Sequence, residues 1–183
     1  MVTAAELLAS AAFGEDRHAQ AFPSFGSERT GAPVMAFCRI DDRQIRLREP
    51  VLEPDALIIQ DPTLLHQVDV FGGLARDGYI LINTTRTFDA LGVGELAGAL
   101  RADRLCTVPA TELALKHVGR PLPNAALLGG FAAVSGRISL ASVAAAIRET
   151  FAGKVADGNV AAASEAHGWV RSEMRELSDA QAG

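Results

Sequence analysis

Two continuous apolar segments, ALIIQD at 56–61 and GYILINTT at 78–85, constrain the fold of this chain more than any other feature. Strands of a parallel sheet are covered on both faces, so they read as unbroken runs of Val, Ile and Leu without polar alternation. The segment between them, PTLLHQVDVFGGLARD, has apolar residues at helical spacing, which predicts a helix that connects two parallel strands. A further strand is expected at 104–111.

Most of the remaining apolar residues follow a helical period. TAAELLASAAF at 3–13 predicts the first helix, with Thr3 available as its N-cap and a glutamate three residues later. A short helix is expected at 93–102. The C-terminal third reads as the helices TELALKHVG, NAALLGGFAAVSG, SLASVAAAIRETF and NVAAASEAHGWVRSEMREL, with Ser139 and Asn159 where the caps of the last two belong.

VMAFCRIDDRQIRLREP at 34–50 predicts two short antiparallel strands on either side of Asp41 and Asp42. Apolar residues alternate with arginines in the second half, as on a half-exposed strand. The fold class predicted is therefore α/β: a three-layer α/β/α domain with a mixed, mostly parallel sheet that includes an antiparallel hairpin, and a helical C-terminal third.

Size and charge narrow the classes of function. A chain of 183 residues with 49% hydrophobic residues can bury one core, so we expect a single domain over 1–183, with 178–183 as a frayed tail. A net charge of -5, with Arg and Lys scattered among acidic residues, argues against nucleic acid and anionic membranes as partners. No apolar run approaches the length of a membrane span and the N-terminus lacks a signal-peptide pattern, so a cytoplasmic location is expected.

The cysteines and histidines of the chain do not form the pattern of a metal site. Cys38 and Cys106 each lie inside an apolar segment, which favours buried, unreactive thiols over metal ligands or a redox centre. The four histidines are spread along the chain without the spacing of a zinc site. We therefore expect no metal on this chain.

The segment AFPSFGSERTGAPV at 21–34 is the strongest candidate for a functional element. It places two Phe, two Pro, two Gly and a Glu-Arg pair between predicted regular elements, and long connections of this kind usually carry function. Asp61, at the end of a predicted strand, is a second candidate, but an Asp before Pro62 more often caps the next helix. Gly129 and Gly130 are read as glycines that permit close helix packing.

Five segments of the chain, taken in order, are QAFPSFGSERTGAPVMAFCRI, EPDALIIQDPTLL, VDVFGGLARDGYILINTT, TVPATELALKHVGRPLPNAALLGGFAA and SLASVAAAIRETF. Together they resemble the gamma subunit of the pyruvate and related 2-oxoacid:ferredoxin oxidoreductases. The resemblance is collinear from about residue 2 to residue 167. Its most specific elements are the motif at 21–34 and the G-R-P-x-x-N-x-x-x-L-G segment at 119–129.

The resemblance implies a subunit of a multi-component enzyme. Complexes of this family decarboxylate a 2-oxoacid on thiamine diphosphate, pass electrons through iron–sulfur clusters to ferredoxin, and release an acyl-CoA. Thiamine diphosphate, Mg²⁺ and the iron–sulfur clusters are then expected in partner subunits of the alpha, beta and delta types, with coenzyme A as co-substrate. The isolated chain is expected to be inactive.

In this family the gamma component packs against the thiamine-bearing core, close to where coenzyme A enters. The resemblance thus assigns the loop to the active-site entrance or to a subunit interface, and both readings stay open. The residues concerned are Ser24, Phe25, Gly26, Glu28, Arg29 and Gly31. Arg29 suits a phosphate or carboxylate, and Glu28 could orient it; no residue of this chain is assigned a catalytic role.

Two departures from the family pattern bear on these expectations. Many relatives carry a second arginine at the position where this chain has Thr30. This chain therefore has one cation fewer with which the loop could bind a phosphate. Family members also begin with a strand and a glycine-rich turn that lead into such a helix, and we expect both to be missing here because the chain starts at Met1-Val2-Thr3, where that helix begins. A start set too late, which we favour, and a fold with an exposed strand edge are the two explanations.

Two alternatives to a pyruvate-specific subunit follow. The complex could act on 2-oxoglutarate, a branched-chain oxoacid or an aryl pyruvate, with the choice made in partner subunits. The chain could also be a purely structural interface subunit.

Overall fold

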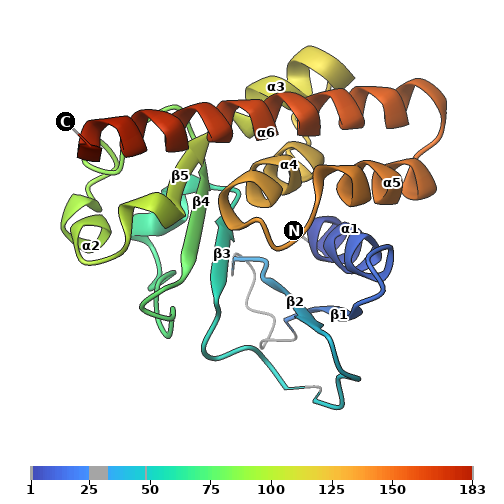
Figure 1. Ribbon diagram of the computed structural model, residues 1–183, viewed down its shortest axis with the longest axis horizontal. Coiled ribbons are helices and arrows are strands. Elements are labelled where there is room, and N and C mark those ends of the chain that lie inside the picture. The colour runs from blue at the N-terminus through green and yellow to red at the C-terminus, as the bar shows by residue number, and fades with distance from the viewer. Residues whose placement is uncertain (1, 25–32, 48, 183) are drawn as a thin grey trace.

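The computed structural model of the chain describes residues 2–24, 33–47 and 49–182 (Figure 1). The strands are β1 His18–Pro23, β2 Ala36–Asp41, β3 Ala56–Ile59, β4 Tyr79–Asn83 and β5 Leu105–Val108. The α-helices are α1 Val2–Phe13, α2 Gly94–Gly98, α3 Ala110–Val118, α4 Asn124–Ser135, α5 Leu140–Thr150 and α6 Gly153–Ala182, and the short 3-10 helices are η1 Pro62–His66 and η2 Ala102–Arg104.

The three predicted apolar strands form a parallel sheet in the order β3-β4-β5. Its central strand is almost fully buried, and successive side chains point to opposite faces of the sheet. Leu81 belongs to the larger core beneath the C-terminal helices, whereas Ile80 and Ile82 pack into a second core with Leu91 and Leu105. The sheet is thus covered on both faces, which confirms the predicted α/β fold class.

The connection between β3 and β4 is not the predicted helix. It begins with η1 and continues as turns to the start of β4. Gly73 explains part of the difference, because it has a φ of +78° and a Cβ there would lie 2.0 Å from the carbonyl oxygen of Leu52. The left-handed backbone at Gly73 and its close approach to Leu52 do not fit a right-handed helix, so a helix cannot continue through this position.

The antiparallel hairpin is present, but its strands are not the two predicted within 34–50. β2 pairs with β1, from His18 opposite Asp41 to Pro23 opposite Ala36, while residues 43–47 form no strand. The rings of Phe22 and Phe37 face each other across this pair with centroids 5.4 Å apart. In the described residues the hairpin is a separate two-stranded sheet, packed against α1.

The C-terminal helices pack on one another, and Figure 1 shows α6 running the length of the molecule beside α3, α4 and α5. The glycine prediction is confirmed at Gly129, where an added Cβ would lie 2.0 Å from the carbonyl oxygen of Ala163 in α6. Ser139 caps α5 by accepting from the backbone N–H of Ser142. Thr3 and Asn159 lie within helices, so the caps predicted at both positions are wrong.

Candidate functional site

A large cleft, with a volume of about 2820 Å³, lies between β2 and β3 and extends to the carboxyl ends of the parallel strands. Ligands of open α/β sheets bind outside the carboxyl ends of the strands, so this end of the cleft is the candidate functional site. The polar residues that line it there are Gln60, Asp61, Asn83, Thr84, Thr85, Thr111 and Glu112.

Asn83 holds this end of the sheet together. It is the last residue of β4, and its side-chain nitrogen donates to the carbonyl oxygen of Gln60 at 2.9 Å and to the hydroxyl of Thr111 at 2.7 Å. Its side-chain oxygen accepts from the backbone N–H of Thr111 at 3.1 Å. One half-buried amide therefore fixes the exit of β3 and the first turn of α3, which makes the carboxyl edge a rigid frame. Asn83 was not among the residues predicted from the sequence, although its place directly after the apolar ILI run was the available signal.

Asp61 is a cap, as predicted. Its carboxylate accepts from the backbone N–H of Thr63 at 2.9 Å and from the Thr63 hydroxyl at 2.7 Å. These hydrogen bonds lower the pKa of the exposed carboxyl below its ordinary value. A general acid needs the opposite shift, so the geometry favours the turn-forming role.

Both ends of the predicted functional loop lie at the cleft. The backbone N–H of Ser24 donates to the carbonyl oxygen of Met35 at 3.0 Å, which closes the loop just beyond the β1–β2 pair. Ser24 and residues 33–35 line the cleft. The other predicted site residues, Phe25, Gly26, Glu28, Arg29 and Gly31, lie outside the described residues.

Four large apolar side chains are exposed where they line the cleft. The exposed fractions are 68% for Val34, 56% for Met35, 60% for Leu47 and 80% for Leu52. Large apolar side chains that face water around one cleft are typical of a surface that another molecule covers. We call these four residues the apolar rim.

The two thiols are held in their neutral form. Burial raises the pKa of Cys38, which lies on β2, and of the buried Cys106, each to about 12. The thiolate is the form that binds metals and attacks electrophiles, so neither side chain has the character of a ligand or nucleophile. Within the described residues, no three His, Cys, Asp or Glu side chains gather as metal ligands would, and none of the helices there is long and apolar enough to cross a bilayer.

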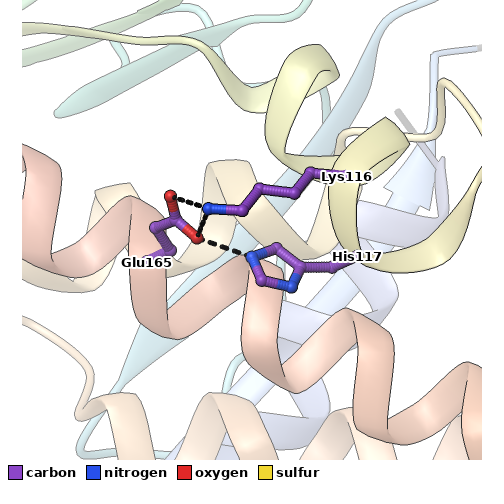
Figure 2. A network of polar contacts seen from close by, with 3 residues as sticks. All are labelled: Lys116, His117 and Glu165. Atoms are coloured by element: carbon purple, nitrogen blue, oxygen red, sulfur yellow. Dashed lines mark hydrogen bonds and ion pairs between the residues drawn. The ribbon is translucent and has the colours of Figure 1, made fainter.

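A separate polar network ties α3 to α6 (Figure 2). The ammonium of Lys116 lies 2.8 Å from both carboxylate oxygens of Glu165, and Nε2 of His117 lies 2.6 Å from one of them. Lys116 first, and then His117, lowers the pKa of the Glu165 carboxyl. The three side chains are partly exposed and do not line the cleft, so the network serves helix packing at the surface.

The chain is similar in sequence to one protein family along most of its length. The sequence model of the family described as pyruvate ferredoxin/flavodoxin oxidoreductase matches residues 1–169. Pyruvate synthase subunit PorC of Methanothermobacter marburgensis is 46% identical over 91% of this chain and 88% of its own length. The pyruvate/ketoisovalerate oxidoreductases common subunit gamma of Thermococcus kodakarensis is 46% identical over 90% of this chain and 88% of its own length.

Solved structures show the same fold. The pyruvate oxidoreductase subunit PORC of Thermotoga maritima superimposes with a TM-score of 0.74 at 33% identity, covering 91% of this chain and 87% of the other. The gamma subunit of a keto/oxoacid ferredoxin oxidoreductase from Geobacter sulfurreducens gives a TM-score of 0.65 at 19% identity, over 92% and 90% of the two chains, and supports the fold alone.

Proposed function

Because this chain belongs to the pyruvate ferredoxin/flavodoxin oxidoreductase family, as a gamma-type subunit, we propose that it supports the CoA-dependent oxidative decarboxylation of a 2-oxoacid to an acyl-CoA, with reduction of ferredoxin. The observation that carries this proposal is similarity along nearly the whole chain to gamma subunits that are themselves about as long. We propose that 1–183 works as one such domain within the complex and is inactive alone.

Pyruvate is the substrate that we propose first, because several relatives are named pyruvate synthase subunits. The Thermococcus relative is named as common to pyruvate and ketoisovalerate oxidoreductases. A subunit shared by two enzymes cannot by itself select between their substrates. This supports the alternative that partner subunits choose the oxoacid, including a branched-chain one.

The cofactors are proposed to lie in partner subunits. An iron–sulfur cluster held by protein thiolates needs four cysteines, and this chain has two, both held as neutral thiols. The clusters are therefore assigned to partner subunits, and the resemblance to the family assigns thiamine diphosphate, its Mg²⁺ and the docking of ferredoxin to alpha-, beta- and delta-type partners as well.

We propose that the loop between β1 and β2 contributes to the active-site entrance. Its two ends line the cleft, at the end of which Asn83 and its neighbours form a rigid polar edge. Arg29 would bind a phosphate of coenzyme A through its forked guanidinium. The competing role, an interface contact, is favoured by the apolar rim beside the same loop.

The first experiment is a pull-down of the tagged chain from its native cells, with mass identification of partners and an assay of CoA-dependent pyruvate oxidation with a viologen dye. Recovery of a thiamine and iron–sulfur protein with this activity is the expected result. A chain that is recovered alone, with no such activity in the eluate, would refute the proposed function.

A reconstituted complex then separates the two roles of the loop. Arg29→Ala should raise the apparent KM for coenzyme A while the complex stays assembled, because the loss is confined to a ligand contact. Arg175→Ala, which removes an exposed arginine on α6, is the matched control and should leave KM unchanged. Loss of assembly with Arg29→Ala would instead assign Arg29 to the interface.

A further inference from the structure

The flank of α6 that contacts α3 and β5 carries an exposed aromatic ring within a row of carboxylates. Trp169, the only tryptophan of the chain, is 42% exposed. Glu165 lies one turn before it and Glu173 one turn after it, and Glu176 follows near the same face of the helix. We call Trp169, Glu173 and Glu176 the tryptophan stripe. An indole beside carboxylates suits a cation, because the face of the ring and the carboxylates both attract positive charge.

Glu165 shows what a paired carboxylate looks like on this flank (Figure 2). Lys116 and His117 of α3 contact it at 2.8 and 2.6 Å, and these contacts lower the pKa of its carboxyl. The ammonium of Lys116 therefore already compensates the charge of Glu165 within the chain.

Glu173, two turns later, has the opposite environment. Its carboxylate accepts from the backbone N–H and from the hydroxyl of Thr107, both at 3.3 Å, which ties it to the edge of β5. Burial raises the pKa of this half-buried carboxyl, hydrogen bonds from Thr107 and Trp169 oppose the rise, and Glu176 adds to it. Among the described residues, no lysine, arginine or histidine forms an ion pair with Glu173. A positive charge supplied from outside the chain would thus stabilise the carboxylate.

The arginines of η2, which packs against α6, have other partners. Arg101, which precedes η2, donates to both carboxylate oxygens of Asp103, at 3.0 and 2.7 Å. Arg104 lies over the ring of Tyr79, 4.7 Å from its centroid, and donates to the carbonyl oxygen of Asp77. Neither guanidinium is left over for the tryptophan stripe.

A second copy of this chain is a poor source of the cation. At about 100° per residue, Arg171 and Arg175 lie on the opposite flank of α6 from the stripe. Pairing that flank of one copy with the stripe of another joins two different faces, which produces rings or open filaments instead of a closed dimer. Pairing stripe with stripe would bring carboxylates together. Charge complementarity therefore favours a different polypeptide.

We propose that the tryptophan stripe is a docking surface for an arginine-bearing segment of a partner polypeptide, in which one guanidinium stacks on Trp169 and pairs with Glu173. Arginine fits better than lysine, because its planar group can lie on an indole while its edge donates two hydrogen bonds to a carboxylate. The inference concerns assembly with a partner and holds whichever reaction the complex catalyses.

The test uses the full chain and a short, labelled helical peptide that is rich in alanine and carries arginines four residues apart. In the control peptide each arginine is replaced by citrulline, which has nearly the same shape without the charge. The arginine peptide should bind one to one, shift the fluorescence of Trp169 and, in an NMR titration, lower the pH at which the Glu173 carboxyl ionises. The citrulline peptide should bind about tenfold or more weakly, because the ion pair and the cation–π contact are lost.

Single substitutions on α6 supply a second readout, followed by the anisotropy of the labelled peptide. Trp169→Leu and Glu173→Gln should each weaken binding about fivefold or more. Asp157→Asn, which removes the same charge from an exposed position on the opposite flank, should leave binding unchanged. Equal binding of the citrulline peptide, an equal loss with Asp157→Asn, or no saturable binding would overturn the proposal. Concentration-dependent assembly that Arg175→Ala abolishes would also overturn it, in favour of a second copy.

Discussion

Replacing Gly129 by alanine tests the close contact between α4 and α6. The new Cβ would lie 2.0 Å from the carbonyl oxygen of Ala163, 2.6 Å from its carbonyl carbon and 2.7 Å from its Cα. Ordinary contact begins at 3.4 Å, so α4 and α6 must separate by more than an ångström. The groups that must move are backbone atoms of a buried helix pair, so no side-chain rotation can relieve the clash.

The magnitude follows from two opposing effects. Overpacking of a well-packed core costs about 1–3 kcal/mol, and a contact with backbone belongs at or above the upper end. Alanine recovers about 1 kcal/mol relative to glycine inside a helix. We therefore expect the free energy of unfolding to fall by about 2 kcal/mol, which lowers Tm by about 4 to 8 °C for a chain of this size.

The assay is equilibrium unfolding in urea, followed by far-ultraviolet circular dichroism and by the fluorescence of Trp169. Gly168→Ala is the matched control, since it lies on the same helix α6 with nothing within 4 Å of the added Cβ. It should raise the free energy of unfolding by about 0.5–1 kcal/mol. If Gly129→Ala is as stable as the parent while Gly168→Ala is stabilised, the reasoning about the α4–α6 contact is wrong.

Three further predictions concern single groups. Burial raises the pKa of the Glu173 carboxyl above its ordinary value of 4.5. The stability that the neutral carboxyl contributes is therefore fully present below pH 4.5 and is lost as the pH rises through the pKa of the folded state. Glu173→Gln should thus be more stable than the parent at pH 7, with no difference in thermal unfolding below pH 4.5; a deficit at pH 7 would contradict this. At pH 8 the thiols of Cys38 and Cys106 should react with iodoacetamide roughly a hundredfold or more slowly than in urea, because their pKa is about 12; rapid labelling of the native chain by mass spectrometry would count against it. Asn83→Leu should lower the free energy of unfolding by about 2 kcal/mol, since it leaves Thr111 without its partners, and chemical denaturation that shows an unchanged midpoint would remove Asn83 from its proposed structural role.

Local patterns were enough to predict the parallel strands and the C-terminal helices. The apolar run that became β4 has one stable environment, the middle of a sheet covered on both faces. The Asp61 cap was also readable, because an Asx cap before Pro depends only on the next two residues. The partner of β2 in the hairpin could not be read from the sequence, since β2 pairs with the HAQAFP strand across the whole intervening loop.

The sequence by itself determined the three parallel strands, the first helix, the C-terminal helices and the family that the chain resembles, because periodicity and motifs are carried by neighbouring residues. Only the tertiary structure decided that Asn83 joins β3, β4 and α3, and that β2 pairs with β1. Each of these depends on contacts between residues distant along the chain, whose free energy is decided by the whole packed arrangement. That is why the polar end of the cleft and the pairing of the hairpin became visible only in the folded molecule.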